Sequence, residues 1–250
     1  MCIRFHLSLS LLFLVTAVLA RPTASMAQIK VITSGGFATP LQAVLPEFEK
    51  ATGIQVSVTR GASQGDGPNT IGAQLRRGEP ADVVIMSREG LDELIEAGRI
   101  VKGTDIDVAQ TPLGMSVRAG APKPDIGTVE AFKQTLLHAK SITIPPSTTG
   151  IYMTTKLFPQ LGIAAALSGK ITNAGLSDLA IRPVSELLGA PDMDFVGTVP
   201  SEIQFISVFS TAVVAGSKEA DASKRLMAFL ASEKALAALK KSGMERPKSH

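Results

Sequence analysis

Cysteine and histidine are almost missing from this chain of 250 residues. The single cysteine, Cys2, lies near the N-terminus, and His138 is the only one of three histidines far from either end. One cysteine cannot form an internal disulfide, and so few thiols and imidazoles make a zinc site or a cysteine nucleophile unexpected. We therefore expect no metal ion and no cofactor.

Aromatic side chains and clusters of one charge are also scarce. The chain has no tryptophan and one tyrosine, and aromatic residues make up 4% of it. The expected mature chain lacks Arg4 and Arg21, so it contains 23 basic and 22 acidic residues. No basic run interleaved with aromatic residues occurs, so the sequence predicts no nucleic-acid partner.

The first 27 residues are typical of a secretory signal. Arg4 precedes an apolar run over residues 7–20, and the small residues Ser25 and Ala27 follow it. As a helix this run would measure about 21 Å, which is short of the roughly 30 Å of a bilayer's hydrocarbon core. We expect cleavage after Ala27, a periplasmic location, and no membrane span in the mature chain.

Strand-like and helix-like segments alternate along the remaining chain. Residues 81–86 (ADVVIM) form the near-continuous apolar run that is typical of a central parallel strand. Residues 41–48 carry apolar side chains at helical spacing, and Thr39 with Pro40 predicts where that helix begins. Such alternation predicts an α/β fold with parallel sheets.

One segment, residues 61–65 (GASQG), matches the nucleophile-elbow pattern G-x-S-x-G of serine hydrolases. An elbow leads directly into a helix, whereas residues 66–68 (DGP) intervene here, and His138 is the only internal histidine available as a base. The hydrolase interpretation is therefore set aside. A strand, a small-residue loop and a helix instead predict a cradle of backbone N–H groups for an anion.

Four loops after predicted strands carry small hydroxyl, amide or glycine residues where a helix is expected. The candidate ligand-binding residues in these loops are Ser34, Gly35, Gly36, Ser63, Gln64, Ser147, Thr149, Gly150 and Ser185. Ordinary N-capping accounts for any single loop. Because ligands bind at the carboxyl ends of strands in open α/β sheets, we expect the loops together to form a site for a small anion.

Three arginines end or follow predicted strands: Arg88, Arg118 and Arg182. A guanidinium group makes bidentate contacts with carboxylates, so this set predicts a carboxylate ligand, although each arginine alone is compatible with a solvated surface. Tyr152, the only tyrosine, is either a core residue or a hydroxyl of the site.

Several blocks resemble the periplasmic solute-binding proteins of the molybdate-binding type. They are residues 46–53 (PEFEKATG), 61–65, 76–88 (RRGEPADVVIMSR) and 112–126 (PLGMSVRAGAPKPDI). The resemblance covers essentially the whole chain after residue 27. It implies a two-lobed, periplasmic-binding-protein-like α/β fold of type II with a ligand cleft between the lobes. Lobe one would comprise residues 28–112 and 208–250, and lobe two residues 113–207.

The first loop, residues 34–37 (SGGF), departs from the Ala-Ala-Ser-Leu type of the molybdate binders. Residues 77–88 (RGEPADVVIMSR) and the block GMSVRAG are similar instead to a divergent branch that resembles bacterial aconitate isomerases. That resemblance implies interconversion of cis- and trans-aconitate by a cofactor-free allylic proton shift, with the arginines holding a tricarboxylate. Glu186 and Tyr152 are the candidate bases. The alternative is a substrate-binding subunit of an ABC transporter, with a permease partner, for molybdate or another small oxyanion or carboxylate.

Overall fold

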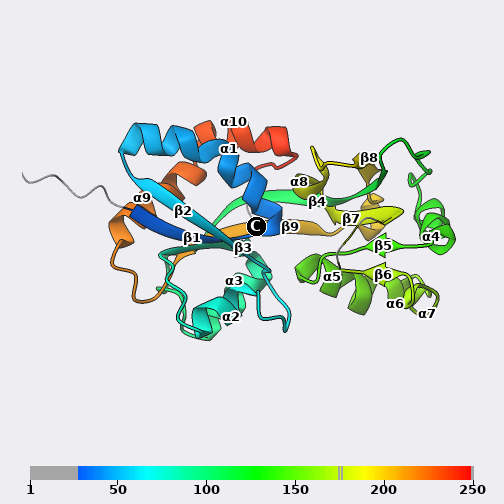
Figure 1. Cartoon of the computed structure of the whole chain (residues 1–250), viewed down its shortest axis with the longest axis horizontal. Coiled ribbons are helices and arrows are strands. Elements are labelled where there is room, and N and C mark those ends of the chain that lie inside the picture. The colour runs from blue at the N-terminus through cyan, green and yellow to red at the C-terminus, as the bar shows by residue number, and fades with distance from the viewer. Residues whose placement is uncertain (1–27, 174, 176, 249–250) are drawn as a thin grey trace, which may run out of the picture.

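The computed structural model describes residues 28–173, 175 and 177–248, so the expected signal segment lies outside the described residues. Strands and helices alternate along this part of the chain (Figure 1). The strands are β1 (Gln28–Ser34), β2 (Gln55–Gly61), β3 (Val83–Ser87), β4 (Ile106–Arg118), β5 (Ile142–Thr143), β6 (Ile171–Thr172), β7 (Leu179–Pro183), β8 (Met193–Thr198) and β9 (Ile206–Val213). The α-helices are α1 (Gly35–Thr52), α2 (Ile71–Arg76), α3 (Arg88–Glu96), α4 (Val129–His138), α5 (Thr148–Tyr152), α6 (Phe158–Gln160), α7 (Ala164–Leu167), α8 (Val184–Leu187), α9 (Ala220–Leu230) and α10 (Glu233–Leu239).

The strands are linked in the order β2-β1-β3-β9-β4-β7-β5-β6, and β8 pairs with β4. Figure 1 shows two lobes, with β4 and β9 running between them. Strand β4 pairs with β9 from Ile106 to Pro112 and with β7 from Leu113 onward. The change of partner falls between Pro112 and Leu113, where the first lobe boundary is expected from the sequence; this boundary and the second one, near β9, both stay predictions.

Parallel pairing accounts for only part of the sheet, which corrects the expectation of parallel sheets. Strand β1 is parallel to β2 and β3, and β5 is parallel to β6 and β7. Strand β9 is antiparallel to β3 and β4, and β4 is antiparallel to β7 and β8. The physical reason is that the chain passes to lobe two along β4 and returns along β9, so these neighbouring strands run in opposite directions.

Each lobe has its own apolar core. In lobe one, the apolar stripe of α1 packs on the sheet with Phe48 fully buried, and a second cluster around Ile71 and Leu91 also forms part of the core. In lobe two, Phe132 and Phe158 lie at the centre of a third cluster. The run ADVVIM contributes β3, which is buried throughout between β1 and β9, as expected for a central strand. No helix in the described ranges is long and apolar enough to cross a membrane.

Helix α1 begins at Gly35, so the predicted start at Thr39 was wrong. Ser34 has extended backbone angles and precedes the first helical residue. A Cβ atom added at Gly36 would lie 2.4 Å from the Phe209 ring of β9, so only glycine allows this close packing of the first turn. The helix tolerates Pro40, its sixth residue, at the cost of one backbone donor.

The missing N–H of Pro40 has a partner in lobe two. In a regular α-helix the N–H of residue 40 would donate to the carbonyl oxygen of Gly36. Proline has no such donor, and the Ser185 hydroxyl of α8 donates to the Gly36 oxygen instead, at 2.7 Å. Helix α1 is thereby hydrogen-bonded to the other lobe through a carbonyl that would otherwise be used within the helix.

This arrangement predicts coupling between Ser185 and Pro40. Ser185→Ala should lower the free energy of unfolding by about 1–2 kcal/mol, because it leaves a buried carbonyl oxygen without a donor. In a Pro40→Ala background the helix supplies its own N–H, so the same substitution should cost clearly less. Urea unfolding of the four proteins of this double-mutant cycle measures the coupling. An equal cost of Ser185→Ala in both backgrounds would contradict the interpretation.

Candidate functional site

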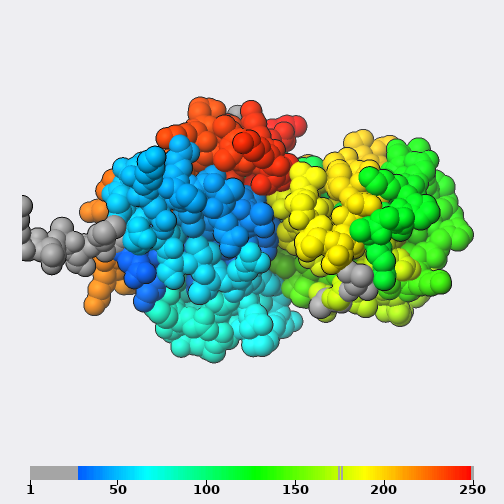
Figure 2. Space-filling view, turned by 45° about the horizontal axis from the view of Figure 1, so that its top comes forward, coloured from blue at the N-terminus to red at the C-terminus, as the bar shows by residue number. Residues whose placement is uncertain are grey.

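A cavity of about 190 Å³ lies between the two lobes, where they meet at the narrow waist seen in Figure 2. We call it the cleft cavity. It is smaller than the roughly 300–1,000 Å³ of pockets for drug-sized ligands, so it fits a small solute. Its lining includes glycines, prolines, Phe209 and one charged side chain, Glu186. Its hydroxyl residues are Ser34, Ser63, Ser87, Ser147, Thr148, Thr149 and Ser207.

Strand ends from both lobes supply this lining. Strands β1, β2 and β3 reach the cavity with their last residues, Ser34, Gly61 and Ser87, and β7 does so with Pro183. The short segment 145–149, after β5, closes the lobe-two side. The carboxyl ends of parallel strands thus meet at one place, as the doubly wound class of α/β folds requires.

Hydroxyl groups join the lobes directly beside the cavity. The backbone N–H of Ser63 donates to the Ser147 Oγ at 3.1 Å, and the Ser87 Oγ lies 2.7 Å from the Thr148 Oγ1. Within lobe one, the Ser63 Oγ accepts from the backbone N–H of Ser87 at 2.9 Å. These neutral contacts form a continuous chain of hydrogen bonds that holds the two walls together.

Two buried hydroxyls of the lining have no hydrogen-bond partner within the described part of the chain. Ser34 and Ser207 are 4% and 3% exposed, and their Oγ atoms are both unpaired. Ser34 immediately precedes α1, an 18-residue helix whose first backbone N–H groups have no acceptor inside the helix. Buried polar groups normally find partners, so these donors are suited to the oxygen atoms of a bound anion.

Glu186 is the only carboxylate in the lining. Its side chain is 17% exposed, and its Oε2 lies 3.5 Å from an Arg182 Nη atom. A Cβ atom placed on Gly35 would lie 3.4 Å from its Oε1, so this oxygen is close to the start of α1. Burial raises the pKa of the Glu186 carboxyl above its ordinary value, and the positive charges of Arg182 and Arg60 oppose this shift without cancelling it. Such a carboxyl can exchange a proton closer to neutral pH than an exposed one.

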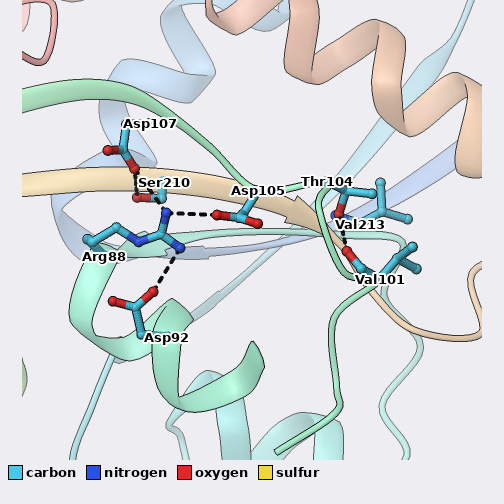
Figure 3. A network of polar contacts seen from close by, with 8 residues as sticks. All are labelled: Arg88, Asp92, Val101, Thr104, Asp105, Asp107, Ser210 and Val213. Carbon is cyan, nitrogen blue, oxygen red and sulfur yellow. Dashed lines mark hydrogen bonds and ion pairs between the residues drawn. The ribbon is translucent and has the colours of Figure 1, made fainter. Parts of the chain in front are cut away.

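Arg88, expected at the ligand, lies in a polar network outside the cavity lining (Figure 3). Its guanidinium group contacts Asp92 at 3.1 Å, Asp105 at 3.0 Å and Asp107 at 3.3 Å. Asp107 lies at the start of β4 and Asp105 immediately precedes it, so this arginine joins α3 to the strand that leads into lobe two. Its charge is neutralised there.

The other two arginines also lie outside the cleft cavity. Arg118 is exposed at the end of β4 and lines a separate hollow of lobe two together with His138. Arg182 lies behind Glu186, with which it forms an ion pair. Neither arginine lines the cleft cavity. In β7 the neighbouring Pro183 lines it, and successive side chains of a strand point to opposite faces, so Arg182 points away from it.

Among the remaining candidates, Tyr152 is part of the lobe-two core. Its ring stacks on Phe205 with centroids 4.6 Å apart, and its hydroxyl donates to the Ile203 carbonyl oxygen at 3.3 Å. The amide of Gln64 donates to Glu93. Gly150 packs directly against Pro145, which lines the cavity. A Cβ atom at position 150 would lie 2.1 Å from the Pro145 carbonyl oxygen, so only glycine fits there. Ser34, Gly35, Gly36, Ser63, Ser147, Thr149 and Glu186 lie in the cavity lining.

Three contributors were not predicted from the sequence: Ser87 and Ser207, which line the cavity, and Arg60, whose charge acts on Glu186. Thr148 also lines the cavity and lies within the predicted loop 147–150. Ser87 ends the ADVVIM strand, so the strand-end rule that selected Ser34 would have found it as well. Ser207 lies inside β9 and comes from a distant part of the sequence, where no local pattern marks it. In the described residues, no group of three or more histidine, cysteine and carboxylate side chains could hold a metal ion.

Comparison with known proteins places the chain in a family. Residues 29–245 match the family described as bacterial extracellular solute-binding protein. The chain belongs to this family. The solute-binding protein is also 37% identical over 226 residues to an aconitate isomerase from a Pseudomonas species, with 86% of each chain covered.

Solved structures confirm the two-lobed, type II α/β fold expected from the sequence. The periplasmic molybdate-binding protein of Azotobacter vinelandii superposes with a TM-score of 0.71 at 21% identity, covering 88% of this chain and 100% of that one. A sulfate-binding protein from Mycobacterium tuberculosis gives 0.68 at 20% identity, with 88% and 87% covered. At these identities the likeness establishes the architecture of the solute-binding protein.

The Arg88 network predicts a structural role for this residue. Arg88→Met should lower the free energy of unfolding by about 1–2 kcal/mol, since it leaves the partly buried Asp105 and Asp107 without their shared counter-charge. Arg77→Met is a matched control, because Arg77 has one ion pair, with the exposed Glu79, and should cost less than about 0.5 kcal/mol. Thermal and urea unfolding measure both. Equal stabilities of the two variants would contradict this role.

Proposed function

We propose that this solute-binding protein is an aconitate isomerase that interconverts cis- and trans-aconitate without a cofactor. The observation that carries the proposal is the 37% identity with the Pseudomonas aconitate isomerase, which extends over 86% of both chains. The cleft cavity supports it independently, since it combines a small volume, anion-binding donors and one carboxylate with a raised pKa.

In this proposal the ligand's carboxylates accept hydrogen bonds from the cavity lining. The Ser34 and Ser207 hydroxyls and the first N–H groups of α1 bind carboxylate oxygen atoms. Neutral donors suit this task, because they hold an anion without an ion pair that would need to be desolvated. The positive end of the α1 dipole favours negative charge at the same place.

Glu186 acts as the general base. Its carboxylate takes a proton from the CH₂ carbon of aconitate, and the electron pair moves through the double bond toward the neighbouring carboxylate. The protonated Glu186 then returns a proton to the carbon at the other end of the allylic system. Hydrogen-bond donors placed where negative charge develops stabilise the transition state of this step, and each typically accelerates it about 10²–10³-fold.

Export to the periplasm, with cleavage after Ala27, is part of the proposal and is supported by the family's description as extracellular.

A second function is favoured by one observation, that no arginine of the described residues lines the cleft cavity. A cavity of hydroxyl and N–H donors also suits a tetrahedral oxyanion. In that case the protein would be the substrate-binding subunit of an ABC transporter and would require a permease partner.

The test of function is turnover of trans-aconitate by the purified protein, followed by chromatography of cis-aconitate with no metal or cofactor added. Glu186→Gln should lower kcat by about 10² or more, because it removes the base while keeping the shape of the side chain. Glu202→Gln, at an exposed position of lobe two, should retain wild-type activity. No turnover by the wild type, with tight binding of molybdate, would favour the transport function.

The pH dependence of kcat/KM tests the assignment of the base. Activity should fall as the pH drops through the pKa of Glu186, because only the ionised carboxylate accepts a proton. Since burial raises this pKa, the fall should lie above the ordinary glutamate value of about 4.3. Arg182→Gln removes an opposing positive charge and should move the fall to higher pH. A profile that is identical in both proteins would assign the fall to the substrate instead.

A further inference from the structure

Glu186 lines two cavities. Besides the cleft cavity, it borders a second cavity of about 210 Å³ on the lobe-two side. We call this second one the rear cavity. Its lining includes Thr143, Ser177, Ala180, Arg182 and Met193, none of which lines the cleft cavity. Glu186 therefore lies in the wall that separates the cleft cavity from the rear cavity.

The two oxygen atoms of this carboxyl have different surroundings. Oε1 is the nearer one to the start of α1, at 3.4 Å from Cβ positions built on Gly35 and on Gly36. Oε2 is the atom that pairs with Arg182, which lines only the rear cavity. One carboxyl thus faces the ligand on one side and the rear cavity on the other.

The rear cavity contains several polar side chains among apolar ones and lies close to solvent. The Arg182 side chain is 32% exposed, and Pro191 of the same lining is exposed as well. Thr143 and Ser177 place their hydroxyl oxygens 2.6 Å apart. A volume of about 210 Å³ has room for several water molecules, each of which occupies about 30 Å³ in the liquid.

We propose that the rear cavity is the route by which Glu186 exchanges protons with solvent while substrate fills the cleft cavity. The inference rests on the proposed isomerase function. Substrate displaces water from the cleft cavity, so water can then reach the carboxyl only from behind. Isomerisation itself needs no such route, because the proton taken from one carbon can be returned to the other.

The atoms and electrons of the reaction balance whether or not the Glu186 proton exchanges with solvent. Proton removal breaks one C–H bond and forms the O–H bond of Glu186, and the electron pair delocalises through the allylic system. Reprotonation breaks an O–H bond, forms a C–H bond at the other carbon and restores the carboxylate. If the acid proton exchanges with water between the two steps, the new C–H bond carries a solvent hydrogen. No oxidant or reductant is involved.

Isomerisation in D₂O tests this route, with product analysed by mass spectrometry and NMR at early conversion and aconitate alone as the blank. The wild-type product should carry solvent deuterium at its new C–H position. Ala180→Leu extends a side chain from the same face of β7 as Arg182 and fills the rear cavity. It should lower the deuterated fraction about threefold while kcat stays within about threefold, since the proton is still returned internally.

Two further variants complete the experiment. Thr143→Val removes a rear-cavity hydroxyl at nearly constant shape and should lower the deuterated fraction in the same direction. Ala131→Leu, the same enlargement on α4 away from the rear cavity, should leave it unchanged. Product without deuterium from the wild type, or undiminished deuterium in both rear-cavity variants, would overturn the inference alone. Absence of product from the wild type would overturn the proposed function and this inference with it.

Discussion

The close contact between the first turn of α1 and α8 is the constraint on which the cleft depends. Glycine at position 36 allows α1 to approach Phe209, and the carbonyl freed by Pro40 accepts the Ser185 hydroxyl from the other lobe. The same contact brings the Glu186 carboxyl to the positive end of a long helix. Larger residues at the start of α1 would separate the donors of lobe one from the carboxylate of lobe two.

The charges are arranged in layers around the cavity. Neutral hydroxyl and N–H groups line it, one carboxylate enters it, and Arg182 lies behind that carboxylate. A trianionic ligand beside an ionised glutamate would be repelled in an uncompensated site. In the proposed reaction the helix dipole and the positive charges of Arg182 and Arg60 offset this repulsion, and the Glu186 oxygen near the start of α1 is not the one that pairs with Arg182.

The fold class could be predicted from the sequence, and so could part of the lining of the cleft cavity. Alternating segments predicted the α/β architecture, the strand-end rule selected Ser34, Ser63 and Ser147, and Glu186 was predicted as a candidate base. All four line one cavity in the structure. The arginines show the limit of that rule, because it locates a residue at a strand end and leaves the direction of its side chain open. Arg88 pairs with Asp105 and Asp107, which follow many residues later at or just before the start of β4, and no local pattern marks them as its partners.

A crystal structure of the Glu186→Gln variant with trans-aconitate would test the central claim most directly. The account predicts a carboxylate of the ligand at the Ser34 and Ser207 hydroxyls and the start of α1. It also predicts the CH₂ carbon within about 3.5 Å of the residue-186 side chain, the distance of a near-attack geometry. Aconitate bound away from residue 186, or held by Arg118 in the outer hollow of lobe two, would contradict it.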